Sequence, residues 1–497
     1  MSVYLNASNS PCMQTGKIAL LHLPFLAALL VAAIYSPSVG GEGDTIMHYF
    51  IAEQALTDPV LFFDLWGKPL FTLFAAPFTL LGFTGIKIFN VLCGVGAVFL
   101  STLTAKKLNY TYYWVLPFLA LLVPAFPFHL LSGLTEPFGA LLVSAILLLL
   151  VLKKNIPAYI LVSFLPYARS EAKVLLIVFI IYAIFQKHYR YLPLLLTGSI
   201  LYALIGSFWK DSVFWIFESP YASGASVYGH GEWNHYIKRL MVMNATPAFI
   251  LLLLGLLSSF IQFFTNADYR KRGFWLTTGN FLVLFCAHST VWALGIFASA
   301  GLERVLIIVF PPMWLLMTKG IEFLSSPLKN KNTWRIALVI LCIGINVKAT
   351  FYNNDLTYYY ANVGLNLSTE QKLIQEEIAP YIKEHHPNHQ LFVADEGYLG
   401  IALVFNMIDH KNRLNWDIVK HPQWHLLNDS TLFFWDSQMP PVQYGVTEEK
   451  VSEIPWLKEV KRWEEYNGIP LHNGRKYILY VFDGDYQQLR SQYEVSR

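Results

Sequence analysis

Charged residues are scarce in this chain, because Asp, Glu, Lys and Arg together make up only 14% of its 497 residues. In soluble domains such residues make up about a quarter of the chain. Hydrophobic residues make up 55%, and apolar runs close to the length that crosses a bilayer as a helix recur up to residue 350. This balance excludes an ordinary soluble protein and predicts a polytopic α-helical membrane protein in contact with membrane lipids.

Cysteines and the common metal and nucleotide motifs are also few or missing. The chain has 4 cysteines, and none of them lies beyond Cys342, so we expect no disulfide framework in the C-terminal part. No HExxH, CxxC or Walker-type loop is present, so a preformed metal or nucleotide site has little support from the sequence. The formal net charge of +3 gives no reason to expect nucleic acid as a partner.

The apolar runs predict about eleven membrane spans, near residues 18–37, 86–104, 112–130, 137–152, 156–168, 173–186, 192–208, 242–263, 274–297, 304–318 and 335–350. Several are short or contain proline, as at Pro117, Pro124 and Pro166. From residue 351 the chain is polar, and helical segments such as STEQKLIQEEIAPYIKEH alternate with strand-like ones such as RKYILYVF. We therefore expect a transmembrane domain over 1–350 and an external α/β domain over 351–497.

Lysine and arginine in the loops set the expected orientation. With the N-terminus inside, most of those in the short loops lie on the inner side, among them Lys106, Lys107, Lys153 and Lys154. An odd number of spans then places the C-terminal domain outside, in a periplasm or lumen. We expect a multi-pass protein of a bacterial inner membrane whose active site faces the periplasm.

Polar residues gather where the spans are expected to reach the outer side. They are Glu42, Asp44, Lys68, Glu136, Arg169, Glu171, His230 and Arg304. A charged group at membrane depth costs a few kcal/mol unless it is paired or solvated. Several such groups on one side therefore predict a shared polar site.

These residues also have purely structural interpretations. Asp44 could solvate a loop or cap the helix that follows it. Glu136 is followed by proline, a pair that is typical of a helix start. Arg169 and Glu171 could form a local ion pair, and a lysine such as Lys87 could extend to the lipid headgroups.

Five segments follow one another between residues 15 and 320: GEGDT around Asp44, WGKPLFTLFAAPFTLLGFTGIKIFN, LTEPFGALL, ARSEA and AGLERVLIIVFPP. Their order and expected side of the membrane resemble the GT-C superfamily of membrane glycosyltransferases, such as mannosyltransferases and aminoarabinose transferases, which take sugar from a polyprenyl-phosphate carrier. In that superfamily an acidic residue follows the first span, and here Asp44 occupies that position. Two features depart from the pattern. Many members have two adjacent acids in the first loop, whereas here Gly43 separates Glu42 from Asp44, and the oligosaccharyltransferase signature WWDYG is absent.

The resemblance implies transfer of sugar from a lipid phosphate to a lipid, glycan or protein acceptor. Such a reaction needs a base for the acceptor hydroxyl, and Asp44 is the candidate. It also needs cations for the leaving phosphate, and Arg304, Lys68 and Arg169 are the candidates. The candidates for positioning the substrate or a divalent cation are Glu136, Glu171, Glu42 and His230.

Two other functions remain open from the sequence. An oligosaccharyltransferase, which moves a whole lipid-linked glycan, would also need a base for the acceptor and cations for the leaving phosphate. A transporter or flippase for lipid-linked sugars is a non-enzyme alternative, but transporters favour internal repeats and broken helices at mid-membrane. The sequence has no repeat that we detect, and its acids lie at one face, which favours an enzyme.

The charge bias of the loops predicts the topology directly. Reporter fusions after Lys154 and Arg272 should read inside, and a fusion after Arg497 should read outside, because positive loops stay on the inner side. An inside reading at Arg497 would contradict the sidedness on which every candidate residue depends.

Overall fold

The computed structural model describes residues 11–40, 43–122, 125–218, 225–226, 228–328, 332–352, 365–420, 426–484 and 491. The chain forms two compact units, which we call the helical unit (Met1–Gly40 and Ala55–Asn366) and the sheet unit (Gly41–Gln54 and Leu367–Arg497). The boundary expected between residues 350 and 351 stays a prediction. The segment Gly41–Gln54, which carries Asp44, groups with the C-terminal part of the chain.

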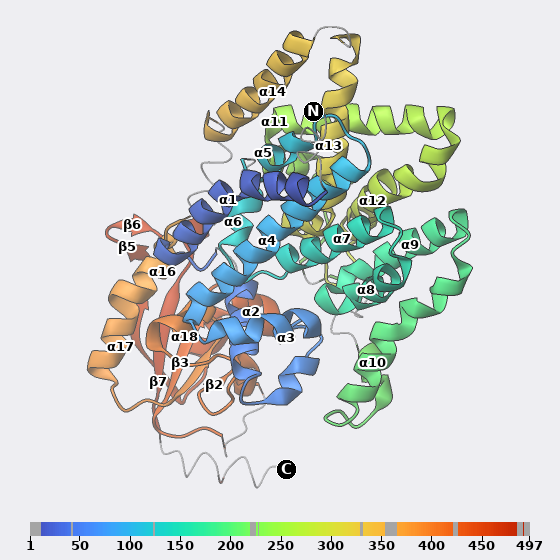
Figure 1. Ribbon diagram of the computed structural model, residues 1–497. Coiled ribbons are helices and arrows are strands. Elements are labelled where there is room, and N and C mark those ends of the chain that lie inside the picture. Colours follow the sequence, from blue (N-terminus) through green and yellow to red (C-terminus); the bar gives the residue numbers. More distant parts are fainter. Residues whose placement is uncertain are drawn as a thin grey trace. The chain divides into compact units, whose positions relative to one another are not determined.

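The helical unit is built from α-helices joined by short loops and 3-10 segments (Figure 1). Its α-helices are α1 (Pro11–Tyr35), α3 (Pro69–Thr79), α4 (Gly82–Lys107), α5 (Leu116–Leu121), α6 (Ala125–Leu130), α7 (Glu136–Val151), α8 (Asn155–Ala168), α9 (Lys173–Phe185), α10 (Thr197–Gly206), α11 (His235–Thr265), α12 (Asn280–Leu294), α13 (Phe310–Ser325) and α14 (Asn332–Tyr352). The 3-10 segments used below are η4 (Ser170–Ala172) and η9 (Glu303–Val309).

Five described helical stretches are long and apolar enough to cross a membrane: Thr15–Tyr35, Gly82–Lys107, His235–Thr265, Tyr269–Leu294 and Glu303–Leu328. Shorter apolar helices cover Pro69–Thr79, Glu136–Val151 and Asn155–Ala168. The chain is therefore an integral membrane protein with several apolar spans, as its composition predicted. Helical segments coincide with every expected span, although the number that cross the bilayer stays a prediction.

Two of the expected spans are broken. The span expected over 112–130 contains two short helices, α5 and α6, and the span expected over 192–208 combines a 3-10 segment with the ten-residue helix α10. The sequence has Pro124 directly before α6, and a proline at such a position disfavours one continuous helix. In contrast, α8 continues past Pro166 and ends at Ala168, so this proline does not divide a span.

Small residues allow the long helices to approach closely. A Cβ atom at Gly255 of α11 would lie 1.9 Å from the carbonyl oxygen of Leu316, and one at Gly320 of α13 would lie 2.1 Å from that of Leu251. Only glycine fits at such a backbone contact, which is the usual way that helices pack in membranes. The α11–α13 pair is therefore tightly packed, and α13 directly follows the segment that carries Arg304.

The sheet unit contains a mixed five-stranded sheet in the order β2-β1-β3-β7-β4. Its strands are β1 (Leu391–Ala394), β2 (Arg413–Leu414), β3 (Thr431–Asp436), β4 (Leu457–Trp463) and β7 (Tyr477–Phe482), with a separate pair β5 (Glu465–Tyr466) and β6 (Ile469–Pro470). Strands β2, β1 and β3 are parallel, whereas β7 is antiparallel to β3 and to β4. The expected C-terminal α/β fold is thereby confirmed.

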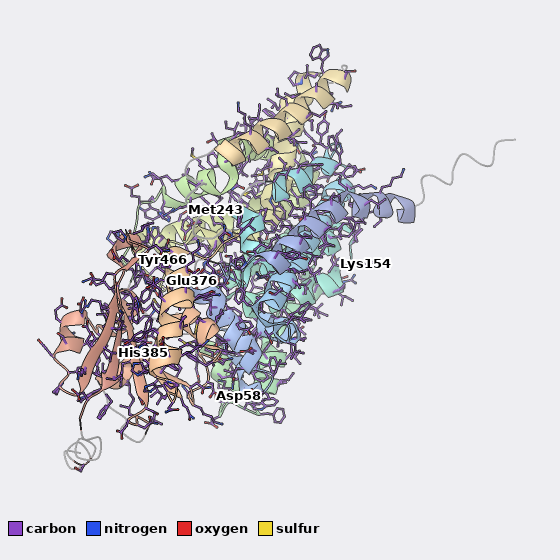
Figure 2. All side chains as sticks on the ribbon, turned by 90° about the vertical axis from the view of Figure 1, so that its left-hand side faces the viewer. Asp58, Lys154, Met243, Glu376, His385 and Tyr466 are labelled. Atoms are coloured by element: carbon purple, nitrogen blue, oxygen red, sulfur yellow. The ribbon has the colours of Figure 1, made fainter. Side chains whose placement is uncertain are left out.

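Aromatic side chains fill the core of this sheet. Trp416, Phe433, Trp435 and Trp456 are buried in one cluster with aliphatic residues of β1 and β7. The helices of the unit are α2 (Gly43–Gln54), α16 (Thr369–Leu373), α17 (Ala379–His385), α18 (Gly397–Leu403) and α19 (Glu448–Ser452). Figure 2 shows Tyr466 beside Glu376, where the tyrosine hydroxyl donates to Oε2 at 2.5 Å and ties β5 to the helical segment before α17.

Candidate functional site

The centre of the candidate site is Glu136, the first residue of α7. Its side chain is 0% exposed. Oε1 lies 3.0 Å from Nη1 of Arg169 and 3.3 Å from Nη1 of Arg304, so one carboxylate oxygen joins two guanidinium groups. The other oxygen, Oε2, is buried and has no hydrogen-bond partner among the described residues.

The local sequence explains why α7 begins at this carboxylate. Proline follows Glu136 in the first turn, where its missing N–H costs nothing. Before the helix, the Asn90 side chain of α4 donates to the carbonyl oxygens of Ser132 at 2.6 Å and of Leu134 at 2.8 Å. These bonds fix the turn that leads into α7 and therefore fix the position of the carboxylate.

Arg169 follows the last residue of α8 and is held from three directions. Its Nε donates to Oε1 of Glu171 at 2.8 Å, its Nη2 pairs with the same oxygen, and its Nη1 donates to Oγ1 of Thr135 at 2.8 Å. A Cβ atom at Gly139 would come within 3.1 Å of Cγ of Arg169, so the neighbouring turn of α7 leaves room for the stem. The local pair of Arg169 with Glu171 is thus present, and it is part of the larger cluster.

Arg304 lies in η9, directly after the first residue of that segment, and its side chain is buried. Beside it, Glu303 lies 3.9 Å from Nε of Arg239 of α11, at a half-exposed position. Residues at the start of α7, directly after α8 and in η9 therefore meet at one buried ion-pair cluster. We call Glu136, Arg169, Glu171 and Arg304 the arginine cluster.

Two histidines and a lysine surround the arginine cluster. His129 lies within electrostatic reach of Glu136 and Arg304, and His288 lies within reach of Glu171 and Arg169. Lys68 also lies within reach of Glu171. Lys68 is buried, and its backbone has a φ of 63°. This left-handed conformation is uncommon outside glycine and is often found at functional sites.

The loop that carries His230 is fastened to the segment before Arg304. Ser226 donates to the Ser299 carbonyl at 2.6 Å, and the His235 ring bonds the Gly301 carbonyl at 2.7 Å. His230 itself is exposed. The structure places it in this fastened loop and outside the arginine cluster, so its role in binding substrate stays a prediction.

The remaining two candidates follow the first span. Asp44 lies in the first turn of α2, within the sheet unit, and is partly exposed. Glu42 lies outside the described residues. The arginine cluster and Lys68, in contrast, belong to the helical unit.

Sequence reasoning missed several residues that hold the site. Thr135 and Asn90 received no role, although Thr135 directly precedes the Glu-Pro pair that marks the helix start. Lys87 does not extend to the headgroups: it is 2% exposed, and its Nζ donates to the carbonyl oxygens of Ser36 at 2.6 Å and Ser38 at 3.3 Å. It therefore fixes the chain where it leaves α1.

Of the three carboxylates that were expected to position the substrate or a divalent cation, Glu136 and Glu171 contact Arg169. In the part of the chain that the structure describes, no group of three or more His, Cys, Asp or Glu side chains is placed to hold a metal ion. A cation held by Glu136 and Glu171 would have to share them with Arg169, and this role stays a prediction.

Comparison with solved structures identifies the fold. ArnT from Cupriavidus metallidurans, solved bound to undecaprenyl phosphate, matches with a TM-score of 0.60 at 10% identity, covering 94% of this chain and 98% of ArnT. The same enzyme in the apo state matches with a TM-score of 0.59 at 11% identity, covering 94% of this chain and 98% of ArnT. No family model and no curated protein matches the sequence.

The chain therefore has the fold of ArnT, a GT-C aminoarabinose transferase. The resemblance to the GT-C superfamily that the motif order suggested is confirmed at the level of the fold. At this identity the likeness does not assign a substrate or a catalytic residue.

The arginine cluster predicts a large difference between two similar substitutions. Glu136→Gln should destabilise the protein by about 3–5 kcal/mol, because it leaves Arg304 and Arg169 buried beside an uncharged group. Glu303→Gln is the matched control: the pair of Glu303 with Arg239 is longer and more exposed, so the loss should stay below about 1 kcal/mol. Thermal unfolding of the detergent-purified variants measures both, and equal stability of Glu136→Gln and the native protein would contradict the central role of Glu136.

Proposed function

We propose that the protein is a glycosyltransferase that moves a sugar from a polyprenyl-phosphate carrier to a lipid, glycan or protein acceptor. The observation that supports this most strongly is the pair of buried guanidinium groups held on Glu136, in a chain with the fold of ArnT. The ArnT structure contains undecaprenyl phosphate, a ligand of the same class as the proposed carrier.

The charges around the arginine cluster suit such a carrier. Three cations, Lys68, Arg169 and Arg304, lie near the carboxylates of Glu136 and Glu171. A phosphodiester between a polyprenyl chain and a sugar carries one negative charge. When the sugar departs, the phosphate gains negative charge, and buried cations stabilise it more strongly than water would.

Arg304 and Lys68 are the primary candidates for the phosphate. Arg169 already bonds Glu136, Glu171 and Thr135, so its main contribution in this proposal is to keep the shared carboxylate in place. A guanidinium suits the phosphate because its planar fork can bond two oxygens at once.

Asp44 is the candidate base. Its carboxylate would take the proton of the acceptor hydroxyl while that oxygen forms a bond to the anomeric carbon. The bond between this carbon and the phosphate oxygen breaks, and polyprenyl phosphate leaves. In the same proposal Glu136, Glu171, Glu42 and His230 position the substrate or a cation, and the reaction takes place at the periplasmic face of a bacterial inner membrane.

Transfer of a whole glycan has less support. The segment FFWDSQMPPVQYG shares only the pair Trp435–Asp436 with the oligosaccharyltransferase signature. Trp435 is 2% exposed and packs in the sheet core, and Asp436 is 0% exposed. The Oδ1 atom of Asp436 accepts from the backbone N–H groups of Gln438 and Met439, so the pair serves the fold of the sheet.

A deletion strain tests the function. Mass spectrometry of its membrane lipids, surface glycans and glycoproteins should show loss of a single sugar from one class, which the native gene restores. Arg304→Ala should fail to restore it, and Arg304→Lys should restore only part, because the fork geometry is lost. Arg239→Ala, at a half-exposed arginine, is the matched control and should restore it fully; full restoration by Arg304→Ala would contradict the phosphate assignment.

The base assignment predicts a severe and selective defect. Asp44→Asn should slow transfer by about 10²–10⁴-fold, since this is the usual loss when a general base is removed. Asparagine is tolerated at a helix start, so expression and binding of undecaprenyl phosphate should stay normal. Turnover in membranes, supplied with undecaprenyl-phosphate sugars, measures the loss.

Glu42→Gln serves as the control for Asp44→Asn, and its effect should be much milder. Native turnover by Asp44→Asn would refute the assignment, and a simultaneous loss in Glu42→Gln would transfer the role to Glu42.

A further inference from the structure

The helix that carries Asp44 is built into the sheet unit. Helix α2 follows α1 in the sequence, yet it forms one compact unit with the residues from Leu367 onward. Figure 1 shows α2 beside α18, although the two helices are far apart in the chain. The position of Asp44 is therefore set by contacts with the C-terminal part of the protein.

Two glycines of α18 bring the helices together. A Cβ atom at Gly397 would lie 3.3 Å from Cγ2 of Ile46, and one at Gly400 would lie 3.0 Å from Cζ of Phe50. Ile46 and Phe50 are four residues apart and lie on the same face of α2. Both are buried, at 2% and 3% exposure, so this apolar contact fixes the distance between α2 and α18. It does not prevent α2 from sliding along its own axis, because that requires directional bonds.

Asn406 supplies those bonds. Its Nδ2 donates to the carbonyl oxygen of Phe50 at 3.1 Å and to Oε2 of Glu53 at 2.8 Å. Its Oδ1 accepts from the N–H of Ile408 at 2.8 Å, which holds the amide in its own turn. Glu53 is oriented in addition by Tyr49, whose hydroxyl donates to Oε1 at 2.6 Å. Both donor hydrogens of the amide thus go to the last turn of α2.

The N-terminus of α18 is bonded to the sheet. Glu396 caps the helix by accepting from the N–H of Tyr398 at 3.1 Å, and its Oε2 accepts from Arg475 at 2.6 Å and from the hydroxyl of Tyr477 in β7 at 3.3 Å. Burial raises the pKa of Glu396, and the neighbouring Arg475 opposes this rise. A continuous set of contacts therefore runs from β7 through Glu396 and α18 to α2.

We infer that Asn406 is a positioning residue for the transfer reaction: by bonding Phe50 and Glu53 it holds α2 in the axial register that places Asp44. The inference rests on the proposed function, in which Asp44 is the base. A base must sit within hydrogen-bond reach of the proton it takes, and a misplacement of about 1 Å can cost about 10²-fold in rate. Loss of Asn406 should therefore lower kcat while the binding of the carrier lipid is unchanged.

The experiment uses the full-length protein and two asparagines of the same turn region. Asn406→Ala removes both bonds to α2, whereas Asn412→Ala, the matched control, removes a bond from Nδ2 to Oδ2 of Asp409 within the turn. Asn406→Ala should lower kcat by about 10–10²-fold with KM for undecaprenyl-phosphate sugar unchanged, and Asn412→Ala should stay within about twofold. Hydrogen exchange of residues 43–54 should become faster in Asn406→Ala only.

A double variant that exchanges the donor and the acceptor of the bond between residues 53 and 406 distinguishes a positioning role from a general loss of folding. In the double variant Glu53→Gln with Asn406→Asp, the glutamine amide donates to the new carboxylate, which restores the bond to residue 53 but not the one to the Phe50 carbonyl. Exchange in α2 and kcat should therefore both recover in part. Native exchange in Asn406→Ala would overturn the docking, and faster exchange with native kcat would overturn the positioning role. The exchange measurement does not depend on a transfer assay. If the native protein transferred no sugar from any donor, the proposed function would be contradicted, but the exchange data would still test whether Asn406 holds α2 against α18.

Discussion

One carboxylate oxygen, Oε1 of Glu136, holds together two buried arginines of the helical unit. It pairs with Arg169 at 3.0 Å and with Arg304 at 3.3 Å, and all three side chains are buried. Burying an ion is costly, and a buried pair is retained only when geometry and further hydrogen bonds compensate. Here Thr135 and Glu171 supply the further bonds to Arg169. The segments that carry these residues therefore have to meet at this point, and the turns before α7 and after α8 are shaped to allow it.

In the proposed function, the same arrangement gives the two arginines different tasks. Arg169 is bonded by two carboxylates and a hydroxyl, so it is the better candidate for holding the cluster together. Arg304 pairs with the same carboxylate of Glu136, and it follows a loop that bonds Ser226 and His235. Positive charge that is fixed in advance stabilises a departing phosphate without reorganisation during the reaction. This division of tasks is the basis of the proposed transfer from a lipid phosphate.

The candidate base is supported by other contacts than the phosphate candidates. Asp44 belongs to a helix that packs on α18 through Gly397 and Gly400, and Asn406 bonds its last turn. The buried Glu396 caps α18 and pairs with Arg475. Polar residues that end β1 thus have a structural task, and the C-terminal part of the chain contributes to the placement of a residue near the N-terminus.

Sequence alone determined the membrane class, the apolar runs, the mixed α/β tail and the identity of Glu136, Arg169 and Arg304 as candidates, because composition and motif order are local properties. Tertiary structure decided the rest. The bond between Glu136 and Arg304 joins residues 168 positions apart, and the bond between Glu53 and Asn406 joins residues 353 positions apart. No local pattern encodes such pairs, since they exist only after glycines and turns bring distant segments into contact. For the same reason the sequence marked Asp44 as a residue after the first span, and only the folded chain attached its helix to the sheet unit.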